Sequence, residues 1–184
     1  MTLIIIAVVL LLIVVYGVGV YNKLIRLRNQ SEESGAAIDA HLKKRYDLIP
    51  NIVETVKGYA SHEKETLVGV IEARNKAMAA TTLVEKNDAA NAFSSTLKSL
   101  FALSESYPDL KANQGFLDLQ KQLQMIEDEL LHARKYYNAV VSDINTIIQT
   151  VPSSIVASLT HFEKLPYLAI EEEARERVSV SFSK

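Results

Sequence analysis

Four histidines are the side chains of this chain best suited to acid–base chemistry or metal binding. They are His41, His62, His132 and His161. No two of them are three, four or five residues apart, the spacing at which histidines on one helix bind zinc. His62 stands beside Glu63 and could bind a metal with help from another helix, but a solvated or capping role explains it more simply.

A second metal pattern is incomplete. Glu129 and His132 have the Glu-x-x-His spacing that di-metal carboxylate bundles use on two helices, and it occurs once here. The chain has no cysteine, which removes thiolate catalysis and cysteine-bound zinc. It also has no glycine-rich phosphate loop and no G-x-S-x-G motif. We therefore predict that the protein is not an enzyme and has no catalytic, metal or cofactor-binding residues, and we identify no small-molecule substrate.

Polar residues on the expected helices form the remaining candidate site. Asp47, Asn51 and Glu54 recur at i, i+4 and i+7, which places them on one helix face. With their available partners, the signature polar cluster comprises Arg45, Asp47, Asn51, Glu54, Arg74, Arg134 and Asn138. Such a cluster is costly in a bundle unless fully paired, and it can then fix helix register. The alternative is a recognition surface for a partner protein.

The clearest element that could position these residues is a helix over 116–151. Apolar residues recur there in alternate steps of three and four: Phe116, Leu119, Leu123, Ile126, Leu130, Ala133, Tyr137, Val140, Ile144, Ile147 and Val151. This stripe is typical of a coiled coil or an antiparallel bundle. Asn113 is the expected N-cap and Pro152 the expected stop.

Three further helices are expected upstream. One begins at Asn87 or Asp88 and ends at the turn-forming run 106–109. Another is capped by Asp47, carries Pro50 in its first turn and continues to residue 78, with a kink or a solvated stretch at 61–65. The first grows out of the N-terminal apolar segment. Short connections near 47–50, 80–87 and 105–113 predict an all-α, antiparallel up-down-up-down four-helix bundle.

The N-terminal segment predicts a single transmembrane helix. Residues 3–20 carry no charge and would make a helix of about 27 Å, close to the roughly 30 Å of a bilayer core. We assign the membrane anchor to Leu3, Ile6, Leu10, Ile13, Gly17 and Val20. A cleaved signal peptide is the alternative, because Gly17 and Gly19 fit a small-x-small pattern. No lysine or arginine precedes the apolar run, which favours a retained anchor.

Basic residues after the anchor predict its orientation. Lys23, Arg26 and Arg28 follow the apolar run and are expected to contact lipid headgroups. The positive-inside rule then places the N-terminus outside and the helical body in the cytoplasm, in a single-pass protein of the cell (inner) membrane.

The chain therefore divides into an anchor (1–21), a helical bundle (22–151) and a short helix with an extended tail (152–184). Its net charge of −2 implies no basic surface for nucleic acid. In the tail, Val178, Val180 and Phe182 alternate with serines in a strand-like pattern that could add to another subunit or partner.

Several segments resemble the LemA family, and the resemblance covers nearly the whole chain. The most specific is 38–60, which contains IDAHLKKRYDLIPN. Others are Tyr107–Asn113, the Ala133-Arg134 and Tyr137-Asn138 pairs with Asn145, and the tail around Tyr167, Ala174-Arg175 and Val180–Phe182. Gly35 departs from the pattern, since a large aromatic is expected there. The resemblance implies a membrane-anchored helical bundle and no particular biochemical activity.

These features predict a non-enzymatic assembly or scaffold protein at the membrane, forming a homo-oligomer. Small residues would let helices of neighbouring copies approach closely: Gly17, Gly19, Ser31, Ser34, Gly35 and Ala36. The alternative is a monomeric adaptor or sensor bundle that relays to a membrane protease, a transporter or another membrane protein.

Overall fold

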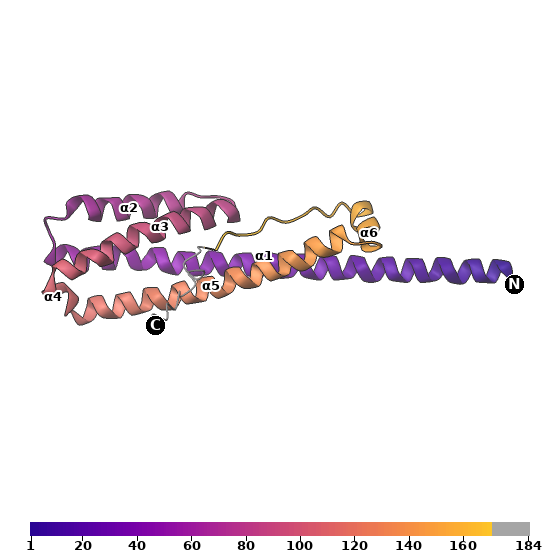
Figure 1. The fold of residues 1–184 in the computed structure, drawn as a ribbon, viewed down its shortest axis with the longest axis horizontal. Coiled ribbons are helices and arrows are strands. Elements are labelled where there is room, and N and C mark those ends of the chain that lie inside the picture. Colours follow the sequence, from indigo (N-terminus) through magenta and orange to yellow (C-terminus); the bar gives the residue numbers. More distant parts are fainter. Residues whose placement is uncertain (171–184) are drawn as a thin grey trace, which may run out of the picture.

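The computed structural model describes residues 1–170, and every regular element among them is helical (Figure 1). The elements in chain order are α1 (Thr2–Tyr59), α2 (Lys64–Met78), α3 (Leu83–Leu103), the 3-10 turn η1 (Ser104–Ser106), α4 (Pro108–Lys111), α5 (Gln114–Gln149) and α6 (Ser153–Leu159). The predicted all-α class and the short helix after Pro152 are confirmed. The tail residues Val178, Val180 and Phe182 lie outside the described residues.

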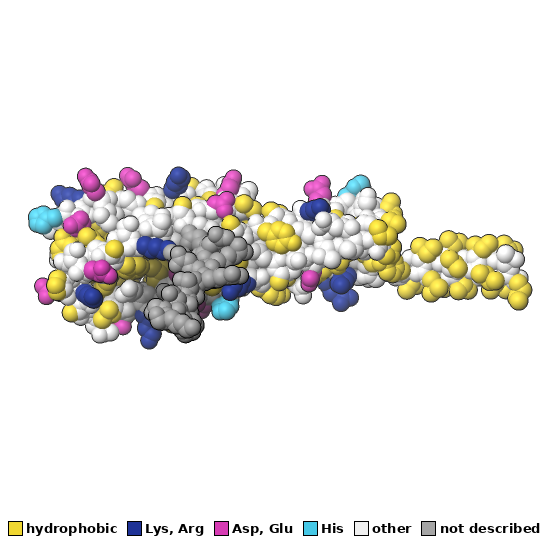
Figure 2. All heavy atoms as spheres, viewed as in Figure 1, with side chains coloured by type: hydrophobic (Ala, Val, Ile, Leu, Met, Phe, Trp, Pro, Cys, Tyr) yellow, Lys and Arg dark blue, Asp and Glu magenta, His cyan; other side chains and the backbone are white. Residues whose placement is uncertain are grey.

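Helix α1 has 58 residues and is about 87 Å long at 1.5 Å per residue. Every side chain from Leu3 to Tyr16 is exposed, and Figure 2 shows the N-terminal end of α1 projecting beyond the body with a mostly apolar surface. From Leu24, which is fully buried, α1 packs against the rest of the chain. By length and composition, the apolar part of α1 is sufficient to cross a membrane.

Helix α1 continues through Pro50, so the predicted helix start at Asp47 and the predicted connection at 47–50 are wrong. Proline has no N–H, and the carbonyl of Tyr46, four residues earlier, therefore loses its helical donor. Arg74 of α2 replaces that donor, since its Nε donates to the Tyr46 oxygen at 2.7 Å. A side chain from another element thus satisfies the backbone where the proline cannot.

The helix predicted over 47–78 is divided instead at residues 60–63. Ala60 is fully buried and its N–H donates to the Val56 carbonyl at 2.8 Å, which closes the last turn of α1. The Glu63 N–H then donates to the Ala60 carbonyl at 3.1 Å. The polar run at 61–65, expected as a kink or a solvated stretch, therefore contains the reversal that leads into α2.

Helix α3 begins at Leu83, earlier than the predicted start at Asn87 or Asp88. The Thr82 hydroxyl accepts from the Glu85 N–H at 3.2 Å, and the Glu85 carboxylate accepts from the Thr82 N–H at 3.1 Å. These two bonds form a capping box. The second bond also lowers the pKa of Glu85, because the N–H of Thr82 stabilises the charged carboxylate. Asn87 is instead a buried residue within α3.

Figure 1 shows how the helices are arranged around α1. Helices α2 and α3 pack against each other along one side of α1, and α5 packs along another. Helix α6 lies beside the apolar part of α1. One hydrophobic core joins residues of α1 through α5, and it also includes Leu168 from the extended segment after α6.

The apolar stripe of α5 faces this packing, as its spacing predicts. Its residues at every seventh position are buried: Phe116, Leu123, Leu130, Tyr137 and Ile144. Asn113 caps the helix as predicted, with its Oδ1 accepting from the Phe116 N–H at 2.9 Å. The prediction that the stripe ends at Val151 is wrong. Val151 is 81% exposed, because α5 ends at Gln149 and Val151 lies in the turn before α6.

Two of the small residues expected to face a neighbouring copy are used within the chain. Ser31 and Ser34 are buried, and their hydroxyls donate to the carbonyls of Arg28 and Ser31 at 2.7 and 3.0 Å. A Cβ at Gly35 would lie 3.4 Å from a methyl carbon of Leu83. Side chains of this chain therefore occupy the space that these small residues leave.

The replacement of a backbone donor by Arg74 can be tested by a double-mutant cycle. Arg74→Ala should lower the free energy of unfolding by about 1–2 kcal/mol, because the Tyr46 carbonyl loses its partner. Pro50→Ala restores a backbone N–H, so the same substitution in that background should cost roughly 0.5 kcal/mol or less. Chemical denaturation in mild detergent measures both, with the exposed Lys76→Ala as control. Equal losses in the two backgrounds would contradict this account.

Candidate functional site

The first polar centre is a buried arginine on α1. Arg45 is 1% exposed, and its Nη1 donates to the Ala90 carbonyl at 3.1 Å. Its Nη2 donates to the Ser94 hydroxyl at 2.8 Å, and its Nε pairs with a carboxylate oxygen of Glu127. The guanidinium also lies 5.0 Å from the centre of the Phe93 ring. Arg45 thus contacts both α3 and α5 from α1.

This arrangement fixes the relative positions of three helices. A buried charge is costly unless it is paired and hydrogen-bonded, and a shift of either neighbouring helix would leave the guanidinium without partners. The planar fork of arginine is needed to reach two acceptors on α3 and a carboxylate on α5 together, which a lysine ammonium could not do. We therefore expect Arg45 to act as a register element, and the role of the polar cluster stays a prediction.

A tyrosine and a second arginine lie beside this centre. Burial raises the pKa of Tyr46, while the charges of Arg45 and Arg134 act in the opposite direction. The Tyr46 ring packs edge-on against Phe93, with ring centres 5.7 Å apart. Arg134 on α5 is also buried, at 7% exposure. The interior between α1 and α5 therefore holds two arginine cations and a phenol whose pKa burial raises.

Glu129 is used in an ion pair between helices. Its Oε2 lies 3.0 Å from His41 Nδ1 and 4.0 Å from Lys44 Nζ, both on α1, while His132 is exposed. Among the residues that the structure describes, no group of three or more histidine and carboxylate side chains is placed to hold a metal ion. The Glu-x-x-His spacing thus contributes one residue to the α1–α5 contact and one to the surface.

The second polar centre is formed by asparagines that hold the segment after α6. Asn138 donates to the Leu168 carbonyl and accepts from the Leu168 N–H, both at 2.8 Å. Asn145 makes the same pair of bonds with Leu165, both at 2.9 Å. From α3, Asn87 donates to the Ala169 carbonyl at 2.9 Å. We call residues 161–170 the strap and these three residues the asparagine clamp.

The clamp amides hydrogen-bond to the strap backbone in the way that the backbone of a neighbouring strand would. A side-chain amide offers one donor and one acceptor, so it can satisfy both backbone groups of one residue. Asn138 and Asn145 are seven residues apart on α5, two helical turns, and they therefore reach the strap at separate points on one face. With the backbone groups of Leu165 and Leu168 satisfied, the strap lies against the helices, and Leu168 is 3% exposed within the core.

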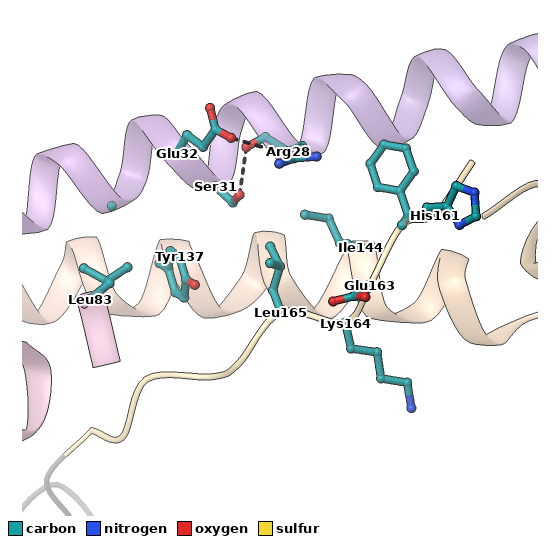
Figure 3. Close-up of a pocket in the computed structure, with 12 residues that line it drawn as sticks. Arg28, Ser31, Glu32, Leu83, Tyr137, Ile144, His161, Glu163, Lys164 and Leu165 are labelled. Carbon is teal, nitrogen blue, oxygen red and sulfur yellow. Dashed lines mark hydrogen bonds and ion pairs between the residues drawn. The ribbon is translucent and has the colours of Figure 1, made fainter. Parts of the chain in front are cut away.

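A cleft of about 430 Å³ lies between α1, α5 and the strap (Figure 3). Tyr137, Ile144 and Leu165 contribute its apolar wall, and Arg28 and Glu32 form an ion pair at 3.3 Å on its α1 side. His161, Glu163 and Lys164 line the strap side and are exposed. The cleft thus combines an apolar wall with solvated charged groups at its edge.

The signature polar cluster is not one site in the structure. Arg45 is at the first centre, Arg134 is buried nearby, and Asn138 belongs to the asparagine clamp. Arg74 donates to the backbone at Tyr46. The remaining three, Asp47, Asn51 and Glu54, are exposed on α1. The shared helix face is therefore solvated, while the proposed partners serve separate structural roles.

Several residues of the two centres were not among the predicted site residues. These are Glu127, Ser94, Asn87 and Asn145. A signal existed for the clamp, because Asn138 and Asn145 repeat at the heptad spacing next to the stripe residues Tyr137 and Ile144. Nothing in the local pattern identified Glu127 as the partner of Arg45, because that pairing joins residues on different helices.

Two comparisons with known proteins match this chain. The profile of the LemA family matches residues 34–182. The chain is also 29% identical over 144 residues to "Protein LemA" of Metamycoplasma hominis, an alignment that covers 76% of this chain. It spans 64% of the length of that relative.

The register role of Arg45 leads to a stability prediction. Glu127→Gln should lower the free energy of unfolding by about 2–4 kcal/mol, because it leaves a buried cation without its counter-ion. Arg45→Met combined with Glu127→Leu should restore part of that loss, since the charge and its partner are removed together. Chemical denaturation followed by circular dichroism measures both. A double variant less stable than Glu127→Gln would contradict the explanation.

The asparagine clamp leads to a local prediction. Asn145→Asp keeps the side chain's shape but removes the donor to the Leu165 carbonyl, and it should release the strap locally at a cost of about 1–2 kcal/mol. Hydrogen exchange at the Leu165 amide should then accelerate by roughly tenfold. Asn91→Ala is a matched control, because Asn91 reaches the Ala169 carbonyl only at 3.4 Å. Unchanged exchange in Asn145→Asp would show that the clamp does not hold the strap.

Proposed function

The chain belongs to the LemA family, and on that premise we propose that it is a non-enzymatic, membrane-anchored scaffold protein that assembles with copies of itself. In this proposal the apolar part of α1 crosses the bilayer once. The rest of α1 forms an antiparallel four-helix body with α2, α3 and α5 beside the membrane. The observation that carries the proposal is α1 itself, since one uninterrupted helix joins an uncovered apolar end to the core of the body.

Anchoring and orientation are supported by the residues at the start of the body. Lys23, Arg26 and Arg28 are exposed just beyond the apolar part of α1, where they can meet lipid headgroups. Their position gives the proposed topology, with the N-terminus outside and the body in the cytoplasm of the cell (inner) membrane. Continuity of α1 across Gly17 and Gly19 favours a retained anchor over a cleaved signal peptide.

A non-enzymatic role is supported by how the buried polar groups are used. The partners of Arg45 are a backbone carbonyl, a hydroxyl and a carboxylate on neighbouring helices. The amides of Asn138 and Asn145 are occupied by the strap backbone. These groups therefore act in holding the fold together, which is what a rigid scaffold requires.

Self-association is supported by the small residues of the anchor. A Cβ added at Gly17 or Gly19 would meet no atom of this chain within 4 Å, so both glycines leave an open surface on α1. Small residues at such positions let transmembrane helices approach closely. Contacts through Val178, Val180 and Phe182 of the tail remain part of the proposal. The alternative is a monomeric adaptor or sensor that relays to a different membrane protein.

Light scattering of the full-length protein in mild detergent tests the proposal. The particle should contain more than one copy of the 20.5 kDa chain. Gly17→Ile with Gly19→Ile should reduce that mass without unfolding the body, because a Cβ at either position meets no atom of the chain within 4 Å. A single copy per particle for the natural sequence would contradict the scaffold proposal and favour the adaptor. Unchanged mass in the variant would remove the glycines from the contact.

A further inference from the structure

The end of the body next to the anchor carries an uncovered apolar surface. Figure 2 shows apolar side chains gathered where α1 leaves the body. Three of them belong to α6 and the turn before it: Val151 is 81% exposed, Leu159 76% and Ile155 59%. Side chains of this size, exposed together on one tip, indicate a surface that meets something other than water.

The position of α6 along α1 places this tip beside the membrane anchor. Pro152, Ile155 and Val156 line an apolar groove together with Val9, Leu12, Ile13 and Tyr16 of α1. Val9 and Tyr16 are about 21 and 10 Å along the helix axis from Lys23, at 1.5 Å per residue. If the hydrocarbon begins near Lys23, α6 therefore lies well within it.

The length of the apolar part of α1 argues against a position of α6 in water. If α6 stayed in water, only residues 2–8 of α1 would be free for lipid. Those residues extend about 10 Å, a third of a bilayer core of roughly 30 Å. A helix that spans the bilayer must therefore bring α6 into the hydrocarbon with it.

The chemistry of the tip suits a lipid environment. No lysine, arginine, histidine, aspartate or glutamate occurs between Ile144 and Thr160, whereas Asp143 precedes this stretch and His161, Glu163 and Lys164 follow it closely. A segment that dips into a bilayer and returns requires this pattern, with charges only where it enters and leaves.

Three hydroxyl groups in the same stretch are bonded to backbone carbonyls of the chain. Thr150 and Thr160 donate to the carbonyls four residues earlier, at 2.8 and 2.7 Å. Ser153 donates to the Ile147 carbonyl at 2.8 Å. In hydrocarbon, polar groups have no water to bond with, so internal partners of this kind are what such a segment needs.

We propose that α6 and the preceding turn (150–159) are a re-entrant second anchor, inserted into the hydrocarbon of the bilayer that α1 spans. The inference rests on the proposed function, because it requires α1 to cross the membrane. The occupant of the apolar surface is lipid, since the surface continues the lipid-facing side of α1 without an intervening charge. Two insertion points fix the angle of the body to the membrane, which one helix alone would leave free.

Fluorescent labelling of the full-length chain tests the insertion. The natural sequence has no cysteine, so a single introduced cysteine is a unique label site. Ile155→Cys and Val151→Cys report on the tip, Val14→Cys on the α1 span, and the exposed Ser106→Cys on the far end of the body. Each variant receives an environment-sensitive dye and is reconstituted in phosphatidylcholine vesicles with a minor share of phosphatidylglycerol. Nitroxide-labelled acyl chains then serve as the quencher.

The tip labels should be quenched roughly threefold or more above the Ser106 label, close to the level of the Val14 label, because both lie in hydrocarbon. Quenching at Val14 with none at Ile155 and Val151 would overturn the second anchor and leave the span intact. A tip label shielded from both lipid nitroxides and aqueous iodide would identify a second copy as the occupant and also overturn it. Absence of quenching at Val14 would remove the span, and with it both proposals.

Discussion

The hydrogen bond from Arg74 to the Tyr46 carbonyl allows one helix to carry both the apolar end and the body. Pro50 would otherwise leave an unsatisfied carbonyl, and a break there would uncouple the last turns of α1 from the rest. Because the helix continues, its apolar end and the core of the body share one rigid axis of about 87 Å. The placement of every other helix is defined against that axis.

Buried polar groups then decide how the other elements lie against α1. Apolar stripes bring α3 and α5 to α1 but tolerate sliding, since one methyl group packs much like another. Arg45 does not tolerate it, because its donors must meet acceptors on both helices. The asparagine clamp does the same for the strap, which has no regular structure of its own. Specific polar contacts thus supply the register that hydrophobic packing leaves open.

The proposed second anchor connects this register to the membrane. The clamp holds the strap against α5 and α3, and the strap in turn limits where α6 can lie. Helix α6 therefore reaches the apolar part of α1 as part of the body rather than as a free appendage. In a scaffold, a body held at a fixed angle presents the same surface in every copy, which favours a regular assembly over random contact.

Local patterns in the sequence were sufficient for the helical class, the apolar N-terminal helix, the α5 stripe and the Asn113 cap, because each depends on residues close together in the chain. Prediction failed at Asp47–Pro50, where local rules favour a helix start and a distant arginine reverses the outcome. Local patterns also did not predict the contact of Glu127 with Arg45 or that of Asn145 with Leu165. The sequence by itself thus determined which segments are helical and which face of each is apolar. Only the tertiary structure decided which helix continues through a proline, which polar groups pair and how deep α6 lies along α1, because those outcomes depend on hydrogen-bond partners that local sequence does not specify.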